Sequence, residues 1–127
     1  MKILIIDDSM MDRRLLTRTI EKAGITCEII QAPDGQEGFK LLNQYATEIC
    51  LILLDWQMPI IDGIEFMKSV QKVPLIADIP IVMVSASSSE ESQKQAKMVN
   101  PKLVAYVVKP FKPDNLIAII LPYVKQV

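Results

Sequence analysis

Short, continuous apolar runs recur along the chain and are separated by longer stretches of mixed character. The runs are three to five residues long, and most of their residues are leucine or β-branched. Runs without polar alternation are typical of strands that are buried on both faces of a parallel sheet. The pattern therefore predicts five strands, at residues 3–6, 28–30, 51–54, 81–84 and 104–108.

The stretches between these runs carry apolar residues at the i, i+3, i+4, i+7 spacing of a helix with one buried face. The spacing is weakest over residues 88–99, where Ala96 and Val99 are among the few candidates for the core. The pattern predicts helices at residues 15–23, 38–45, 63–70, 88–99 and 116–124.

Polar residues mark several helix ends. Asp34 with Glu37, and Ser88 with Glu91, have the spacing of a capping box at a helix start. Gly24 follows the first helical stretch as a C-terminal stop.

Strands and helices alternate five times, which predicts an α/β fold of packed layers with right-handed crossovers. The chain has 127 residues and shows no linker or repeat. We therefore expect one domain over residues 1–127, with no output domain.

The composition narrows the functional classes. Fourteen basic residues face fifteen acidic ones, so the positive surface that nucleic-acid binding requires is missing. No histidine is present, which excludes an imidazole base or ligand from this chain. No secretory signal or bilayer-spanning run is found, so we expect a cytoplasmic protein without membrane insertion. Cys27 and Cys50 are expected to be buried free thiols.

Polar residues directly follow four of the five predicted strands. Asp7 and Asp8 follow the first strand, Asp55 the third, Ser85 the fourth and Lys109 the fifth. In an open parallel sheet, ligands bind beyond the carboxyl ends of the strands. We therefore expect these five side chains to gather at one edge of the sheet.

Three carboxylates at one edge would repel one another, and a divalent cation would remove that conflict. Mg²⁺ prefers oxygen ligands, while a lysine ammonium and a hydroxyl would hold further oxygens. The set therefore predicts a site for Mg²⁺ and a phosphoryl group. Each acid taken alone is better explained as a helix cap or turn residue. The four strand ends favour the phosphoryl site only when they are taken together.

Four blocks of the sequence resemble the receiver domains of two-component response regulators, in particular the single-domain, CheY-like regulators. They are residues 5–9, 53–59 with Asp62 and Gly63, 84–86 and 109–111. The blocks stand in the order and at the spacing of that family and span nearly the whole chain. The resemblance implies a flavodoxin-like (βα)5 three-layer sandwich with a parallel sheet of order 2-1-3-4-5.

The resemblance also implies the roles of the polar residues. Asp55 would accept the phosphoryl group in a Mg²⁺-dependent reaction. Asp8 and Asp55 would bind the metal through their side chains and Gln57 through its backbone carbonyl, while Asp7 would hold a metal-bound water.

Ser85 and Lys109 would bind the phosphoryl group, and Tyr106 would be the aromatic switch residue that turns inward when Ser85 moves. Gln57 and Ser87 align with positions that tune hydrolysis of the acyl phosphate. Phosphorylation would alter the surface formed by the fourth helix, fifth strand and fifth helix. Ordinary core packing is the alternative explanation of Tyr106.

The donor implied by the resemblance is a sensor histidine kinase or a histidine phosphotransfer protein, and the output is a downstream target protein. The domain would assist its own phosphorylation and dephosphorylation without being an enzyme, and we expect a monomer. The main alternative is a pseudo-receiver, a phosphorylation-independent interaction module. Such modules usually lose an acid or the lysine, and all of these residues are present here.

Two enzyme classes of similar architecture fit the sequence less well than a receiver domain does. A dinucleotide-binding enzyme would need a Gly-x-Gly-x-x-Gly turn where Asp7-Asp8-Ser9 stands. A phosphatase with an aspartyl nucleophile would carry it on the first strand, at Asp7 or Asp8, and would not depend on Asp55.

Three local features complete the expectations. Lys109-Pro110 fits the cis peptide bond of the family. Asn100 and Pro101 stand where many receivers have a glycine-containing turn, which puts the end of the fourth helix in question. Met10 and Met11 are expected to pack within the first helix rather than to bind anything.

Overall fold

Strands and helices alternate along the chain, as the sequence predicted. The computed structural model describes residues 1–124, so the last three residues of the expected domain lie outside the described part. The strands are β1 (Lys2–Ile6), β2 (Glu28–Ala32), β3 (Ile49–Leu54), β4 (Ile81–Ser85) and β5 (Ala105–Val108). The helices are α1 (Met10–Lys22), α2 (Gly35–Gln44), α3 (Gly63–Gln71), α4 (Glu90–Val99) and α5 (Pro113–Val124).

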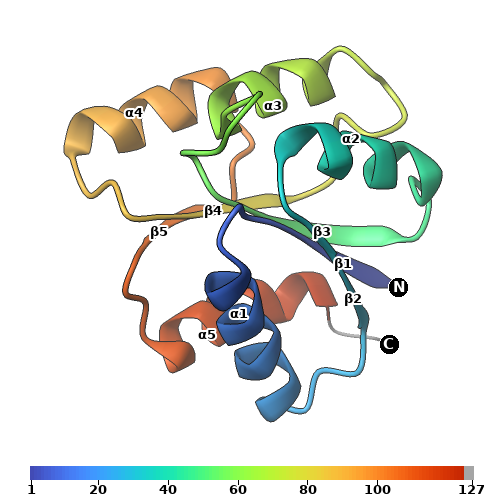
Figure 1. The fold of residues 1–127 in the computed structure, drawn as a ribbon, viewed down its shortest axis with the longest axis vertical. Coiled ribbons are helices and arrows are strands. Elements are labelled where there is room, and N and C mark those ends of the chain that lie inside the picture. The colour runs from blue at the N-terminus through green and yellow to red at the C-terminus, as the bar shows by residue number, and fades with distance from the viewer. Residues whose placement is uncertain (125–127) are drawn as a thin grey trace.

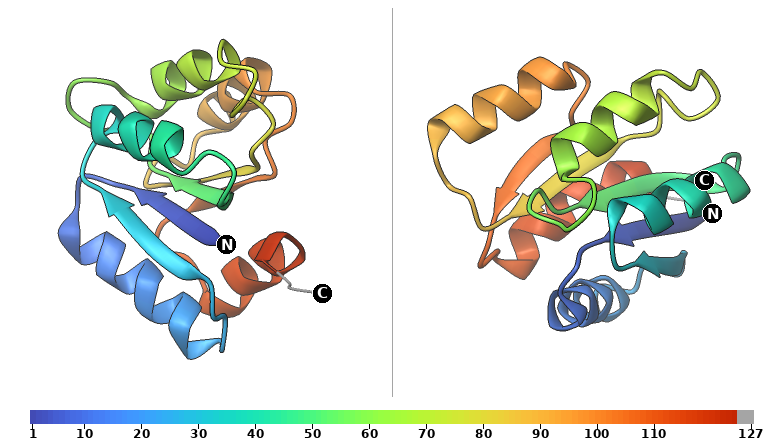
Figure 2. Two further views of the ribbon diagram at one scale, coloured as in Figure 1. Left: turned by 90° about the vertical axis from the view of Figure 1, so that its right-hand side faces the viewer. Right: turned by 45° about the horizontal axis from the view of Figure 1, so that its top comes forward.

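The five strands form one parallel sheet in the order β2-β1-β3-β4-β5. Helices α2, α3 and α4 cover one face of this sheet, and α1 and α5 cover the other (Figure 1). The left view of Figure 2 shows the sheet between the two helical layers. The predicted three-layer flavodoxin-like fold and its strand order are therefore confirmed.

Successive residues of β1 point into different layers of the core. Leu4 and Ile6 pack with α2, α3 and α4, whereas Ile3 and Ile5 pack with α1 and α5. All four side chains are fully buried. Because both faces of the sheet are covered, its strands need no polar alternation, which explains the continuous apolar runs in the sequence.

Helix ends follow the expected chemistry with one correction. Asp34 caps α2 by accepting a hydrogen bond from the Glu37 N–H, and Gly24 follows α1 with a φ of 83°. The predicted cap of α4 at Ser88 is wrong. Ser89 is the N-cap instead, and its hydroxyl accepts a hydrogen bond from the N–H of Ser92 at 3.0 Å.

The turn after α4 forms without a glycine. The Asn100 side chain accepts a hydrogen bond from the N–H of Lys102, and its backbone carbonyl accepts one from Leu103. Asn100 thereby satisfies the backbone groups of the turn that carries the chain toward β5. On α4, Ala96 is fully buried and Val99 packs against the same core, as expected.

Two expectations about individual side chains have opposite outcomes. Cys27 and Cys50 are buried free thiols, as predicted. Met10 and Met11 are 54% and 78% exposed, so the expectation that they pack within the first helix is wrong. Both lie in the first turn of α1. Within residues 1–124 no helix is both long and apolar enough to cross a membrane.

Candidate functional site

The carboxyl ends of β1 and β3 bring three carboxylates together. The Asp55 N–H donates a hydrogen bond to the Ile6 carbonyl at 2.9 Å, which places Asp55 beside Asp7 at the end of the sheet. One carboxylate oxygen from each of Asp7, Asp8 and Asp55 lies within 4.8 Å of the other two. Asp7 and Asp55 are buried and Asp8 is exposed, so the cluster opens to solvent on one side.

Lys109 reaches this cluster from the end of β5. Its backbone N–H donates to the carbonyl of Ser85 at 2.8 Å, and its peptide bond to Pro110 is cis, as the family resemblance implied. The Nζ atom lies 2.8 Å from Asp7 Oδ2 and 3.7 Å from Asp55 Oδ2. A single ammonium group therefore faces both buried carboxylates.

Both carboxylate oxygens of Asp7 already have partners. Oδ1 accepts a hydrogen bond from the Ser9 N–H at 2.9 Å, and Oδ2 accepts one from Lys109. The backbone carbonyl of Asp7 accepts a further one from Arg13 Nη1 at 2.6 Å. Asp7 is therefore held in place before any ligand arrives.

Sequence reasoning missed a fourth carboxylate. Asp12, in the first turn of α1, lies 2.8 Å from Lys109 Nζ through its Oδ2 atom. The spacing of Ser9 and Asp12 was visible in the sequence, but that pattern signals a helix cap. Ser9 does cap α1, and its hydroxyl accepts from the Asp12 N–H at 3.2 Å. Nothing local in the sequence pointed the carboxylate of Asp12 toward Lys109.

Burial and nearby negative charge shift the pKa of Asp55, the candidate phosphoryl acceptor. Desolvation and, after it, repulsion by Asp7 raise the pKa of Asp55 to about 6, although Lys109 opposes the shift. Burial alone would lower the pKa of Lys109, but hydrogen bonds to Asp12 and Asp7 and the charge of Asp55 outweigh it and raise the pKa. The lysine is therefore a permanent cation, while Asp55 is ionised only part of the way at mildly acidic pH.

The donor set fits a hard divalent cation. Three carboxylates converge, and among residues 1–124 Lys109 supplies the one ammonium group at ion-pair distance, so the cluster keeps excess negative charge. Mg²⁺ binds through oxygen ligands and keeps several waters, so a shallow cluster with one exposed acid suits it.

The remaining predicted residues lie at the end of β4, in the loop after β3 and in β5. Ser85 ends β4 and is 1% exposed, and its Oγ accepts a hydrogen bond from the Ser87 N–H at 3.3 Å. Gln57 is exposed in the loop after β3. Tyr106 is half-buried, and its ring meets that of Trp56 edge to face with the centroids 6.3 Å apart. No hydrogen bond within residues 1–124 joins Gln57 or Tyr106 directly to the carboxylates.

Gly63 explains part of the local sequence around Asp55. A Cβ atom at residue 63 would lie 2.6 Å from the Asp55 carbonyl oxygen and 3.0 Å from the Trp56 Cα atom. Both contacts involve backbone, which cannot move aside without displacing the acceptor candidate. The start of α3 is therefore packed directly against the segment that carries Asp55.

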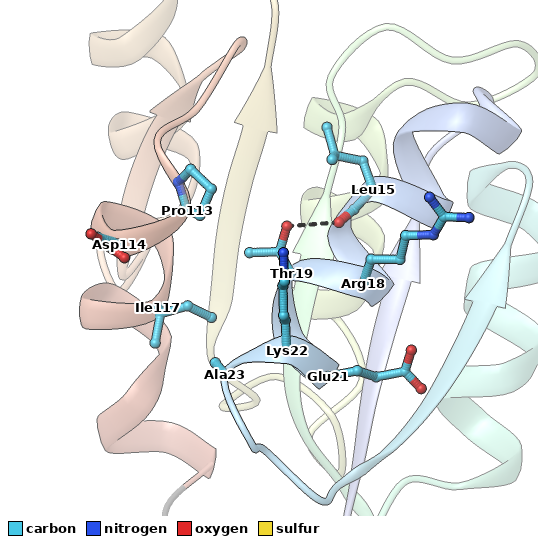
Figure 3. Close-up of a pocket in the computed structure, with 9 residues that line it drawn as sticks. All are labelled: Leu15, Arg18, Thr19, Glu21, Lys22, Ala23, Pro113, Asp114 and Ile117. Atoms are coloured by element: carbon cyan, nitrogen blue, oxygen red, sulfur yellow. Dashed lines mark hydrogen bonds between the residues drawn. The ribbon is translucent and has the colours of Figure 1, made fainter.

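A separate groove of about 770 Å³ runs between α1 and α5. Leu15 and Thr19 of α1 face Pro113 and Ile117 of α5 across it (Figure 3). None of the three clustered carboxylates lines this groove. It therefore contributes no group to the site at the strand ends.

A family comparison is consistent with this geometry. Residues 3–121 match the model of the response regulator receiver domain. That range includes the acid cluster, Ser85 and Lys109, so the match covers the whole site and all of the fold except the first residue of β1 and the last turn of α5.

The chain is also similar to individual proteins of known name. The chain is 34% identical over 116 residues to the phosphate regulon transcriptional regulatory protein PhoB of Pseudomonas aeruginosa, covering 91% of this chain but 48% of the relative. It therefore spans about half the length of that protein. A chemotaxis protein CheY homologue of Campylobacter jejuni is 31% identical, with 91% of this chain and 86% of the relative covered. The solved structure of the chemotaxis response regulator CheY4 of Vibrio cholerae has a TM-score of 0.83 and 30% identity, covering 96% of this chain and 97% of that one.

Proposed function

The chain belongs to the response regulator receiver domain family, and on that premise we propose that Asp55 accepts a phosphoryl group from a phosphohistidine of a partner protein. The phosphoacceptor role is general to the family. The observation that carries the assignment to Asp55 is its position between Asp7, Asp8 and the ammonium group of Lys109. The donor would be a sensor histidine kinase or a histidine phosphotransfer protein.

The reaction places covalent chemistry on the domain itself. A carboxylate oxygen of Asp55 attacks the phosphorus, the phosphorus–nitrogen bond breaks, and the electron pair leaves with the imidazole of the partner. The Trp56 N–H donates to Asp55 Oδ1 at 2.8 Å and fixes the carboxylate plane. Lys109 and Ser85 would then hold phosphoryl oxygens, where charge builds up during the transfer.

Mg²⁺ would be held by the carboxylates of Asp8 and Asp55 and by the backbone carbonyl of Gln57. Asp7 would act through a metal-bound water, which agrees with the occupation of both of its oxygens by Ser9 and Lys109. When bound, the ion would offset the negative charge that accumulates on the transferring phosphoryl group.

The output of the domain would be a changed protein-binding surface. The Tyr106 hydroxyl reaches the loop after β4, which connects Ser85 to α4. Movement of Ser85 toward a phosphoryl group would shift that loop and with it the α4-β5-α5 surface, to which a downstream target protein would bind. Receiver domains are in general not classical enzymes, and we assign no reaction on another substrate to this chain.

The test is intact mass after incubation with acetyl phosphate, with and without Mg²⁺. We expect a Mg²⁺-dependent phosphoryl adduct in the wild type and none in Asp55→Asn. Asp62→Asn is the matched control, because Asp62 caps α3 nearby and asparagine caps a helix equally well. This control should keep the adduct.

Two outcomes would contradict the proposal. An adduct that persists in Asp55→Asn would place the acceptor elsewhere, as in a phosphatase with its nucleophile on β1. A wild type that binds Mg²⁺ but forms no adduct would favour the alternative of a phosphorylation-independent pseudo-receiver.

A further inference from the structure

Asp12 stands at the position of a capping box but does not make the hydrogen bond that such a box requires of it. It is the third residue of α1 after the N-cap Ser9, where an acidic side chain commonly reaches back to the N–H of the N-cap residue. Here that N–H already donates to Asp7 Oδ1 at 2.9 Å. The carboxylate of Asp12 is therefore free to extend across to Lys109.

Lys109 divides its hydrogen bonds between two acids. An ammonium group has three N–H donors, and hydrogen bonds of 2.8 Å join Lys109 to Asp7 and to Asp12. Asp55 Oδ2, at 3.7 Å, is within ion-pair distance but beyond a hydrogen bond. Before phosphorylation, Lys109 thus binds Asp12 more closely than it binds the acceptor.

The two acids that bind Lys109 differ in burial. The side chain of Asp7 is 2% exposed and that of Asp12 is 38% exposed. Release of Asp7 would leave a buried charge without a partner, which is costly. Release of Asp12 exposes its carboxylate to water, which solvates it. If Lys109 turns toward a new anion, Asp12 is therefore the partner that it gives up.

Asp12 also places a negative charge beside Lys109, the residue that would bind the phosphoryl group. It is not one of the three clustered carboxylates that converge on the cation position. The charge of Asp12 therefore neutralises Lys109, the group that a phosphoryl oxygen needs. The raised pKa of Lys109, to which Asp12 contributes by a hydrogen bond, agrees with a strong contact.

From this geometry we propose that Asp12 is a positioning residue that holds the Lys109 ammonium before phosphorylation and competes with the phosphoryl group for it. The inference rests on the proposed function of Asp55. Asp12 does not touch the reacting atoms. It acts through Lys109, and it sets how tightly the phosphorylated state is held.

The test measures binding of beryllofluoride, an analogue of an acyl phosphate, at saturating Mg²⁺. Trp56 is the only tryptophan of the chain and directly follows Asp55, and its backbone N–H donates to Asp55 Oδ1, so we use its fluorescence as the reporter of the site. We expect Asp12→Asn to lower the half-saturating beryllofluoride concentration roughly 1.5- to fivefold, the range of a partly exposed ion pair. The Mg²⁺ affinity, titrated separately, should be equal or weaker.

Two further variants separate charge from structure. Asp114→Asn removes a charge from an exposed residue in the first turn of α5, with no contact to Lys109, and should bind beryllofluoride like the wild type. Asp12→Glu restores the carboxylate and should move the half-saturating concentration back toward the wild-type value. A role of Asp12 in folding alone would instead weaken Mg²⁺ and beryllofluoride binding together.

The outcomes are distinguishable from those of the proposed function. An unchanged or higher half-saturating concentration in folded Asp12→Asn would overturn the role of Asp12, provided that the wild type responds. A wild type that binds Mg²⁺ without responding to beryllofluoride would instead contradict the phosphoacceptor role of Asp55.

Discussion

The hydroxyl group of Tyr106 donates a hydrogen bond to the backbone carbonyl of Ser87 at 2.8 Å. The bond ties the middle of β5 to the loop between β4 and α4. Ser87 is also joined to α4, because its hydroxyl donates to Ser92 Oγ at 2.9 Å. Tyr106 and the first turn of α4 are therefore linked through one residue that lies two positions after Ser85.

We expect Tyr106→Phe to lower the free energy of unfolding by about 1 kcal/mol, the usual contribution of one hydrogen bond. The variant keeps the ring and its contact with Trp56 but loses the bond to Ser87. Urea unfolding measures the change. Tyr123→Phe is the control, because Tyr123 is 37% exposed on α5 and should change little. Equal stability of the two variants would show that the hydroxyl group of Tyr106 contributes nothing.

Asp55→Asn is expected to stabilise the metal-free protein at neutral pH. The pKa of Asp55 in the folded protein, about 6, is above the ordinary value of 3.8 for an aspartate, so the folded state binds this proton more tightly than the unfolded chain. The ionised carboxylate therefore lowers the free energy of unfolding above about pH 6, and this penalty vanishes as the pH falls toward about 4. The gain from the substitution should be about 1–3 kcal/mol at pH 7.

Denaturant unfolding of wild type and Asp55→Asn across that pH range, with a chelator present, measures the effect. The difference between the two proteins should shrink as the pH falls from 6 to 4. A stability gain that remains constant with pH would show that the charge of Asp55 is not its source. Asp114→Asn, at an exposed position, is the control for loss of one negative charge.

Ile60→Asn is expected to stabilise the protein although it removes an apolar side chain. Ile60 has a φ of 72° and is 70% exposed. The left-handed region costs roughly 1–2 kcal/mol for an ordinary residue, and asparagine tolerates it better. Leu75→Asn is the matched control, because Leu75 is 66% exposed without a positive φ. Thermal or urea unfolding should show a free energy of unfolding that is higher by about 0.5–1 kcal/mol for Ile60→Asn alone. Equal changes in the two variants would show that the backbone of residue 60 is not strained.

Gln57→Ala and Ser87→Ala are expected to change the lifetime of the acyl phosphate while leaving its formation intact. Gln57 is exposed beside the acceptor, and Ser87 is half-buried next to Ser85. The resemblance to receiver domains implies that these two side chains position or block an attacking water. Decay of the phosphoryl adduct, followed by mass after removal of acetyl phosphate, measures the rate. Ser88→Ala should decay like the wild type, and equal rates in all the proteins would rule out tuning by Gln57 and Ser87.

The start of α4 shows why sequence reasoning located the helix but not its first residue. Residues 87–89 are three consecutive serines, and each is a suitable cap. The hydroxyl of Ser87 is committed to Ser92, and its carbonyl is committed to Tyr106. These bonds remove Ser87 as a cap, and of the two remaining serines it is Ser89 whose side chain accepts from the Ser92 N–H. Three adjacent serines look alike in the sequence, so the local pattern could not select one of them.

The exposed methionines show a similar limit. Met10 and Met11 are apolar residues shortly before the helix predicted at residues 15–23, for which packing is the reasonable expectation. In the structure the buried residues of α1 are Leu16 and Ile20, so the first turn of the helix contributes nothing to the core. The position of a helix relative to the sheet edge is set by tertiary packing.

By itself, the sequence determined the class of fold and the residues at the strand ends. Apolar periodicity is local, and parallel strands of alternating β and α segments must end at one edge, so Asp7, Asp55 and Lys109 could be assigned there in advance. Only the tertiary structure decided how these groups share their charges. Asp12 and Lys109 are 97 residues apart in the chain, yet they lie 2.8 Å from each other. Which carboxylate binds a lysine depends on distance and burial in three dimensions, and neither quantity is encoded in local spacing.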